Sequence, residues 1–286
     1  MKQARLVLGG GSAYGLAHIG VIRELEKHFE ITSIIGTSMG AIVGGVYASG
    51  VPAEELPALA EDVSIFELFN PRNLDFRRSG IFDGRALLRL FEDWTDGKRI
   101  EQGAIPFTAV SYDLSRKTTV LFDSGFFADA MRASSSLPLI FAPHELGDYF
   151  LVDGGVSHPL PLAFAESQKG EITIAVNVLP PVADEAEFYR EKDVKTKHKE
   201  DRISVFLKAL MQNQGSMALH AIVQYEPDIV IDAHHPELGF TDLKRAREYW
   251  EWGEKKTQEA LRDHEEPGFK ERLREGYQRI LGRYLD

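Results

Sequence analysis

The first fifty residues alternate strand-like and helix-like segments separated by glycine turns, and this order constrains the fold more than any other feature. Residues 4–8 and 31–35 are short apolar or β-branched runs that end in glycine, which predicts two buried strands. Residues 16–29 have apolar positions at helical spacing, and residues 41–48 form an apolar segment closed by glycine and proline, so we expect a helix in each. A strand-helix-strand-helix order with short connections is typical of a parallel sheet covered by helices. The sequence therefore predicts an α/β fold.

The rest of the chain continues this pattern less regularly. Further strands are expected at residues 107–112, 118–122, 150–152, 172–178 and 229–231, with a helix starting at residue 129. Aromatic residues among charges in residues 54–102 predict a helical cap, and dense charges of both signs in residues 184–202 predict a surface loop. We expect one main domain over residues 4–250, with the cap inserted at 54–102, and a charged helical tail over residues 251–286.

Composition excludes several classes of protein. The chain has 33 Lys and Arg against 44 Asp and Glu, a formal net charge of −11. A domain with this much negative charge is a poor candidate for binding the phosphate backbone of nucleic acid. It has no cysteine, so disulfides, cysteine-ligated zinc and thiol catalysis are excluded. No apolar run reaches the ~18 residues of a membrane span, and residues 1–8 lack the apolar region of a signal peptide. We expect a cytoplasmic protein; the sequence leaves its oligomeric state open.

The segment Gly36-Thr37-Ser38-Met39-Gly40 is a G-x-S-x-G motif placed between a predicted strand and a predicted helix. A nucleophile at such a turn needs small neighbours, because its backbone is strained and the chain passes close to itself. The following helix adds a dipole that favours a developing anion. The motif alone is common by chance, but its context predicts Ser38 as a nucleophile, with Gly36 and Gly40 forming the elbow around it.

The segment from Gly9 to Gly15 is a glycine-rich loop between the first strand and the first helix. Such a loop directs several backbone N–H groups one way, which suits a phosphate or an oxyanion. A dinucleotide site would need an acidic residue at the end of the second strand, and that strand instead ends in Gly36-Thr37-Ser38. We therefore predict an oxyanion hole formed by Gly10, Gly11 and Ser12.

Asp153-Gly154-Gly155 follows another predicted strand. An isolated Asp-Gly is usually only a turn, so its interest comes from its position. Adjacent parallel strands deliver their carboxyl ends to the same edge of a sheet, where ligands bind. On this basis we expect Asp153 to meet Ser38 and the glycine loop at that edge.

Histidine is the usual partner of a catalytic serine, and His158, His234 and His235 are the candidates that the sequence offers. His18 and His144 fit structural roles better. The adjacent pair His234-His235 lacks the spacing of a helical zinc pair, so we expect no metal and no cofactor. An α/β-hydrolase places its serine elbow after several strands, whereas this elbow follows the second one, which argues against that fold.

Together and in this order, the glycine loop followed by L-A-H-I-G-V-I, the G-T-S-M-G elbow and D-G-G resemble the patatin-like phospholipase family. The segment Arg132-Ala133-Ser134-Ser135-Ser136-Leu137-Pro138 is similar to the family segment before its D-G-G strand, and P-D-I-V-I at residues 227–231 is similar to its last core strand. The resemblance covers roughly residues 4–250. Within the family, the chain most resembles the bacterial stand-alone members. As a set the motifs are specific, although each is common alone.

The resemblance implies a three-layer α/β/α sandwich with a mostly parallel central sheet and a Ser-Asp dyad without histidine. Ser38 would attack an ester carbonyl and Asp153 would accept its proton. Two positions depart from the family pattern: Tyr14 stands where Arg or Lys is usual, and Ser12 where glycine is usual. These departures put the substrate class and the rate in doubt more than the dyad.

The sequence leaves three functions open. The first is a serine esterase acting on acyl lipids such as a phospholipid, a lysophospholipid or a neutral ester. The second is a regulatory, protein-binding member with little turnover, and the third is a thioesterase or acyltransferase that uses the same dyad. Apolar residues Phe66, Leu68 and Phe69 and the segment 203–211 fit an acyl pocket, peripheral contact with a membrane, or ordinary core packing. The cationic residues of the 184–202 loop are diluted by acids, so a solvated loop is the simpler interpretation.

Overall fold

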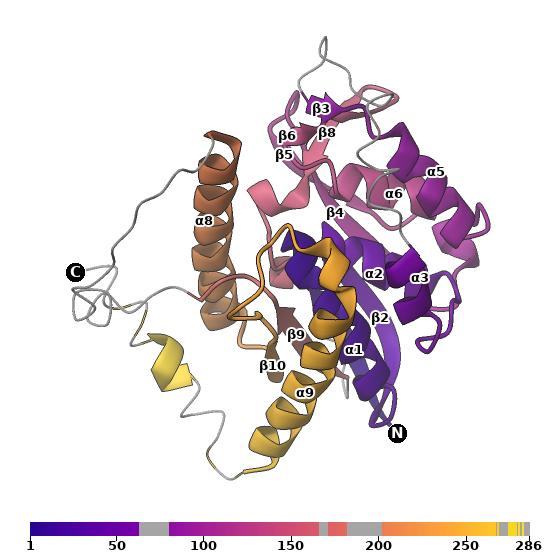
Figure 1. The fold of residues 1–286 in the computed structure, drawn as a ribbon. Helices are drawn as coiled ribbons and strands as arrows, with labels where there is room; N and C mark the ends of the chain where they lie inside the picture. Colours follow the sequence, from indigo (N-terminus) through magenta and orange to yellow (C-terminus); the bar gives the residue numbers. More distant parts are fainter. Residues whose placement is uncertain are drawn as a thin grey trace.

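The computed structural model describes residues 1–62, 80–165, 171–181 and 202–266, with short pieces between 268 and 282 (Figure 1). Its strands are β1 (Lys2–Leu8), β2 (Phe29–Thr37), β3 (Gly80–Phe82), β4 (Phe107–Asp113), β5 (Thr118–Phe122), β6 (Leu139–Phe141), β7 (His144–Leu146), β8 (Tyr149–Asp153), β9 (Ile172–Asn177) and β10 (Ile229–Asp232). Its α-helices are α1 (Ala17–Leu25), α2 (Met39–Ala48), α3 (Leu56–Asp62), α5 (Arg85–Trp94), α6 (Phe127–Ser134), α8 (Arg202–Tyr225) and α9 (Ala246–Glu265).

The main sheet has the strand order β10-β9-β1-β2-β4-β8-β7, and β5 also pairs with β4. The five strands from β10 to β4 run parallel to their neighbours. The pairs that β5, β7 and β8 form are antiparallel. The predicted α/β fold with a mostly parallel central sheet is therefore confirmed.

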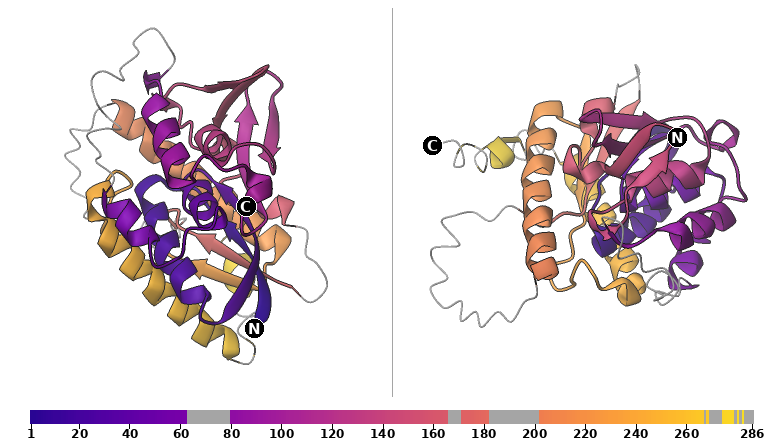
Figure 2. Two further views of the ribbon diagram at one scale, coloured as in Figure 1. Left: turned by 90° about the vertical axis from the view of Figure 1, so that its right-hand side faces the viewer. Right: turned by 90° about the horizontal axis from the view of Figure 1, so that it is seen from above.

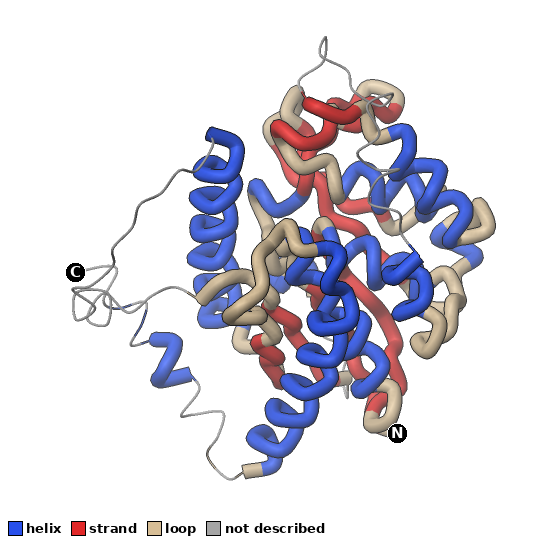
Figure 3. The backbone as a smooth tube through the Cα atoms, in the orientation of Figure 1, coloured by secondary structure: helices blue, strands red, loops and turns tan. Residues whose placement is uncertain are grey.

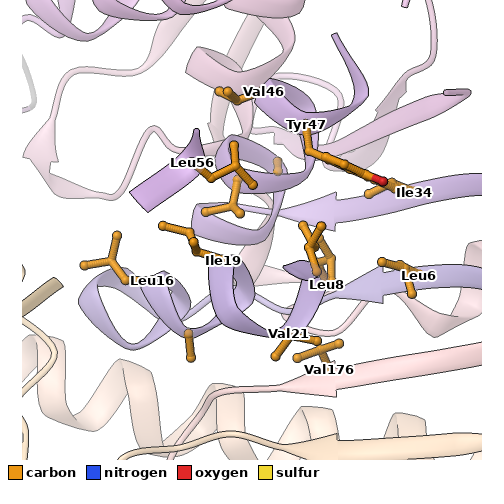
Figure 4. Packing of buried hydrophobic residues seen from close by; sticks show 14 of the residues in the cluster. Leu6, Leu8, Leu16, Ile19, Val21, Ile34, Val46, Tyr47, Leu56 and Val176 are labelled. Carbon is orange, nitrogen blue, oxygen red and sulfur yellow. The ribbon is translucent and has the colours of Figure 1, made fainter. Parts of the chain in front are cut away.

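Helices cover both faces of the sheet, and the alternation of side chains along β1 shows why. Leu6 and Leu8 point to the face packed against α1, α2 and α9, while Val7 points to the face packed against α8. Figure 4 shows part of the hydrophobic cluster that contains Leu6 and Leu8. In the view from above, α8 (orange) lies along one side of the molecule and the indigo to magenta segments lie on the other (Figure 2). The strands lie between these helical layers (Figure 3), which gives the expected three-layer sandwich.

The direction of β8 differs from the expectation. We expected Asp153 to follow a strand parallel to the first two, but β8 is antiparallel to β4. Strand β4 extends beyond the end of β2, and β8 pairs with this overhang. Because β5 occupies the other edge of β4 along residues 109–113, β2 and β8 must share one edge. Their carboxyl ends point toward each other, with Thr37 beside Val110 and Asp153 beside the next residue, Ser111.

Helix α9 is an integral part of the described fold. It packs along α1 so closely that a Cβ on Gly20 would lie 1.8 Å from the carbonyl oxygen of Trp250, and one on Gly253 would lie 2.1 Å from that of Ala17. Arg23 and Glu254 add an ion pair of 2.7 Å between the two helices. The predicted start of the tail, residue 251, falls inside this helix.

Two predicted features lie largely outside the described residues. Phe66, Leu68 and Phe69 of the predicted cap are outside them, and so are residues 184–201 of the predicted charged loop. The described part of residues 54–102 contains α3, β3 and α5. The division into domain, cap and tail stays a prediction.

Candidate functional site

Ser38 occupies the single position between β2, which ends at Thr37, and α2, which begins at Met39. Its backbone has φ 53° and ψ −121°, a conformation that is costly for a residue with a side chain. The backbone N–H of Ser38 donates to the hydroxyl of Ser134 at 2.9 Å, and its carbonyl accepts from the N–H of Ile42 at 3.0 Å. These bonds hold the strained turn and leave the Ser38 side chain at the sheet edge.

Glycine is required on both sides of Ser38 because backbone segments cross there. A Cβ on Gly36 would lie 2.6 Å from the carbonyl oxygen of Gly40. A Cβ on Gly40 would lie 2.4 Å from the carbonyl oxygen of Leu8 at the end of β1. The spacing of the motif therefore reflects the close approach of α2 to β1 and to the end of β2.

Ser38 and Asp153 are in direct contact. The Ser38 hydroxyl donates to Oδ2 of Asp153 at 2.5 Å, and the N–H of Gly155 donates to Oδ1 at 2.7 Å. Both carboxylate oxygens of Asp153 are thus engaged, which fixes the side chain toward Ser38. The structure brings together the two side chains that the motifs singled out.

Asp153 is only 2% exposed. Burial raises its pKa to about 6, although the hydrogen bonds from Ser38 and Gly155 act in the opposite direction. A carboxylate with such a pKa is a stronger base than an exposed aspartate and is still ionised at neutral pH.

The glycine loop lies against Ser38, since a Cβ on Gly10 would be 3.2 Å from Cβ of Ser38. The N–H of Gly10 donates to the carbonyl of Pro159 at 2.8 Å, so it is already occupied. Among the described residues, no acceptor is hydrogen-bonded to the N–H groups of Gly11 and Ser12. Of the three donors predicted from the sequence, the N–H groups of Gly11 and Ser12 thus remain candidates for an oxyanion hole.

Ser12, which stands where the family pattern has glycine, takes a left-handed conformation with φ 51°. Serine therefore adopts here a backbone geometry that glycine adopts more easily. Tyr14, the other departure, is buried, and its ring lies 4.7 Å from that of His234 and 6.2 Å from that of Tyr249. The residue that stands in place of a cation is part of an aromatic cluster.

His18 is hydrogen-bonded to the start of the glycine loop. It is fully buried, and its Nε2 donates to the carbonyl of Gly9 at 2.8 Å. Burial lowers the pKa of His18 to about 4, so the ring is neutral at physiological pH. The structural role expected for this residue is therefore specific: it holds the carbonyl that begins the glycine loop.

Within the described part of the chain, His144, His158, His234 and His235 are not hydrogen-bonded to Ser38 or Asp153. His158 is within 3.2 Å of the Thr119 hydroxyl, His144 is within 3.2 Å of Asp129, and His234 belongs to the aromatic cluster. Among the described residues, no three His, Asp or Glu side chains form a group suited to a metal ion. None of the described helices is both long and apolar enough to cross a bilayer.

Sequence reasoning from motifs missed the hydroxyl groups that support the site. Besides binding the Ser38 N–H, the Ser134 hydroxyl donates to the carbonyl of Val110 at 2.6 Å. The Ser111 hydroxyl donates to the carbonyl of Val152 at 2.7 Å, and the N–H of Asp153 donates to the carbonyl of Ser136 at 3.0 Å. The only available signal was the S-S-S run at residues 134–136, which the family resemblance singled out without assigning a role.

Ser38 and Asp153 open onto a cavity of about 230 Å³. Its polar lining includes Gly11, Ser12 and Gln214, and its walls are otherwise mostly apolar. Leu207 and Met211 of α8 lie on the wall, so part of the 203–211 segment faces this site. A largely apolar cavity with a few convergent polar groups is typical of a small-molecule or lipid site.

The fold and this site define a class of protein: an α/β/α sandwich in which a strained serine after the second strand is hydrogen-bonded to a buried aspartate. The sequence model of patatin-like phospholipases matches residues 6–165. The chain belongs to the patatin-like phospholipase family.

Known relatives and structures agree with this assignment. An uncharacterized NTE family protein of Mycobacterium bovis is 40% identical over 177 residues, covering 60% of this chain and 48% of that protein. Lysophospholipase NTE1 of Debaryomyces hansenii is 32% identical, and patatin-like phospholipase domain-containing protein 6 of Homo sapiens is 30% identical; each match covers 60% of this chain and 12% or 13% of that protein. The matches therefore span less than half of each relative's length. The structure of VipD from Legionella pneumophila shares the fold, with a TM-score of 0.59, 13% identity and coverage of 92% of this chain and 67% of that one.

Proposed function

We propose that this protein is a serine acyl-ester hydrolase that acts on acyl lipids, with Ser38 as the nucleophile and Asp153 as the base. The observation that carries the proposal is the 2.5 Å hydrogen bond from the Ser38 hydroxyl to a buried carboxylate. A serine hydroxyl becomes an effective nucleophile when a positioned base accepts its proton. Membership of a phospholipase family and similarity to a lysophospholipase support a lipid ester as the substrate.

The reaction follows from these positions. Ser38 Oγ forms a bond to the ester carbonyl carbon while its proton passes to Oδ2 of Asp153. Collapse of the tetrahedral intermediate breaks the bond to the alcohol oxygen, which takes the proton from Asp153 and leaves. Water then attacks the acyl-enzyme, gives its proton to Asp153, and releases the fatty acid as the proton returns to Ser38.

The negative charge on the former carbonyl oxygen needs donors that are fixed before the reaction. In our proposal the N–H groups of Gly11 and Ser12 serve this purpose, because they line the same cavity as Ser38 and have no acceptor among the described residues. The loss of one such donor typically costs about 3–4 kcal/mol of transition-state stabilisation. In our proposal the raised pKa of Asp153 and these two donors take the place of a histidine base, which the described residues do not supply at Ser38.

A fluorophosphonate probe tests the proposal, because it labels activated serines whatever the natural substrate. We expect labelling of the intact protein at Ser38, none of Ser38→Ala, and weak labelling of Asp153→Asn. Hydrolysis of a lysophospholipid should fall at least about a thousandfold in Ser38→Ala. Ser49→Ala is the matched control, since Ser49 is a buried serine whose hydroxyl donates to the carbonyl of Val46, within its own helix turn. If the folded protein is never labelled, the regulatory, protein-binding alternative takes the place of this proposal.

A further inference from the structure

A second, almost entirely apolar cavity lies next to the cavity that contains Ser38. It measures about 100 Å³, and the fourteen described residues that line it carry aliphatic, aromatic or methionine side chains. They come from α1, α2, α3 and α5, from Leu16 just before α1, and from Leu243 at the start of a short 3-10 helix. Figure 4 shows Leu16, Ile19, Val46 and Leu56 of this lining on neighbouring elements.

The two cavities share part of their walls. Met39, Ile42, Leu87 and Leu243 line both of them. Met39 directly follows Ser38, and Ile42 lies one helical turn further along α2. These four residues therefore line both the space beside Ser38 and the second cavity, so the two cavities are adjacent.

We propose that the apolar cavity binds the far end of the substrate's acyl chain and so sets the chain length that the enzyme prefers. This inference rests on the proposed function and adds the binding site for the acyl group. Among the described lining residues there is no charged side chain, hydroxyl or carboxamide, and the indole N–H of Trp94 is the single polar side-chain group, so neither a polar head group nor an ion suits the cavity. Apolar cavities of this kind stay dry and accept hydrocarbon: about 150 Å³ holds a benzene ring, so about 100 Å³ has room for roughly four carbon atoms.

Burial of hydrocarbon in this cavity gives a measurable preference. Each methylene group moved from water to an apolar site contributes a factor of about four in binding. Four such groups therefore change the specificity well over tenfold between a chain that reaches the cavity and one that does not. The preference should be seen in kcat/KM across a series of p-nitrophenyl esters from acetate to palmitate.

Helix α3 offers a matched pair of variants for the test. Ala60 lines the cavity, whereas Ala58, on the same helix, is exposed and lines neither cavity. Ala60→Phe fills the cavity, so we expect kcat/KM for long-chain esters to fall at least tenfold while the value for the acetate ester stays within twofold. Ala58→Phe should keep the profile of the unmodified protein. An identical profile for the two variants would overturn the inference.

Trp94 gives a second measurement that does not depend on hydrolysis, because its side chain lines the cavity. A saturated fatty acid with bromine at its far end quenches a tryptophan that it contacts. We expect this acid to quench the protein's fluorescence, and we expect Trp94→Phe to remove most of the quenching while Trp252→Phe retains it. Quenching that is unchanged in Trp94→Phe contradicts the inference. If no ester is hydrolysed by any form of the protein, the proposed function fails, and the quenching result alone decides whether the cavity binds the chain.

Discussion

The hydroxyl of Ser134 links the turn after β2 to the middle of β4: it accepts a hydrogen bond from the N–H of Ser38 at 2.9 Å and donates one to the carbonyl of Val110 at 2.6 Å. Val110 is the residue of β4 that pairs with Thr37, the last residue of β2. One buried hydroxyl at the end of α6 thus fixes the strained turn at Ser38 against the middle strand of the site. Without this hydroxyl, the N–H of Ser38 and the carbonyl of Val110 would each lose a hydrogen bond.

Ser134→Ala should therefore lower activity through the position of Ser38. We expect kcat and the rate of fluorophosphonate labelling to fall about tenfold or more, with KM close to its original value, because the cavity that binds substrate is unchanged. The loss of these two hydrogen bonds should also cost about 1–3 kcal/mol of stability. Ser49→Ala, which removes an equally buried hydroxyl away from the site, should leave kcat unchanged. Equal kcat for the two variants contradicts this role.

The pH dependence of the reaction should report the pKa of Asp153. This carboxyl must be ionised to accept the proton of Ser38, and burial raises its pKa to about 6. We expect kcat/KM to be constant above neutral pH and to fall tenfold per pH unit below about pH 6. A profile that stays flat down to pH 4.5 is incompatible with Asp153 as the base.

Asp153 should also limit the stability of the protein. Its pKa is about 6 in the folded protein and near 3.8 in an exposed chain, so the folded state binds the proton more tightly. The stabilising contribution is therefore complete below about pH 3.8 and is lost as the pH rises through 6, a difference of about 3 kcal/mol.

Asp153→Asn removes this ionisation and should unfold at a higher temperature than the unmodified protein at pH 8. The advantage should shrink at pH 5, where the aspartate is already largely protonated. Thermal unfolding of both forms across this pH range provides the measurement, and an equal advantage at both pH values would count against the assignment.

His18 should matter for activity through the carbonyl of Gly9. His18→Phe keeps an aromatic ring but removes the N–H that donates to this carbonyl, so we expect kcat to fall about tenfold and stability to fall by about 1–3 kcal/mol. His18→Gln retains an N–H donor of similar reach and should recover much of both. Full activity in His18→Phe would exclude a positioning role.

The same residue should contribute to acid sensitivity. Burial lowers the pKa of His18 to about 4, below its ordinary value near 6.5, so the charged form is disfavoured in the folded state. Its contribution to stability is present above about pH 6.5 and is lost as the pH falls toward 4. Urea unfolding at pH 7 and pH 5 should show a smaller loss of stability for His18→Gln than for the unmodified protein.

Local patterns were sufficient for much of the fold. The glycine after each of the first two strands, the apolar runs and the turn signals predicted β1, β2, α1 and α2 to within a few residues. The sequence did not indicate α8 as a single helix of 24 residues, because its apolar positions are spread among polar ones and its packing partners lie on distant strands. Nor did it indicate that α9 lies against α1, since a close crossing at Gly20 and Gly253 depends on contacts across more than 200 positions of chain.

The sequence by itself determined which residues could form the site: a serine flanked by Gly36 and Gly40, a glycine loop and an aspartate, each at the end of a strand. These signals are local, because backbone crossings and strained turns restrict the residue at each position directly. Only the tertiary structure decided how they meet. Asp153 reaches Ser38 from the opposite direction to the one expected, because the overhang of β4 lets β8 pair along the same edge as β2. The same packing occupies the N–H of Gly10 with Pro159, buries Asp153 so that its pKa rises, and places Ser134 against the turn. These features depend on groups far apart in the chain, so no local pattern specifies them.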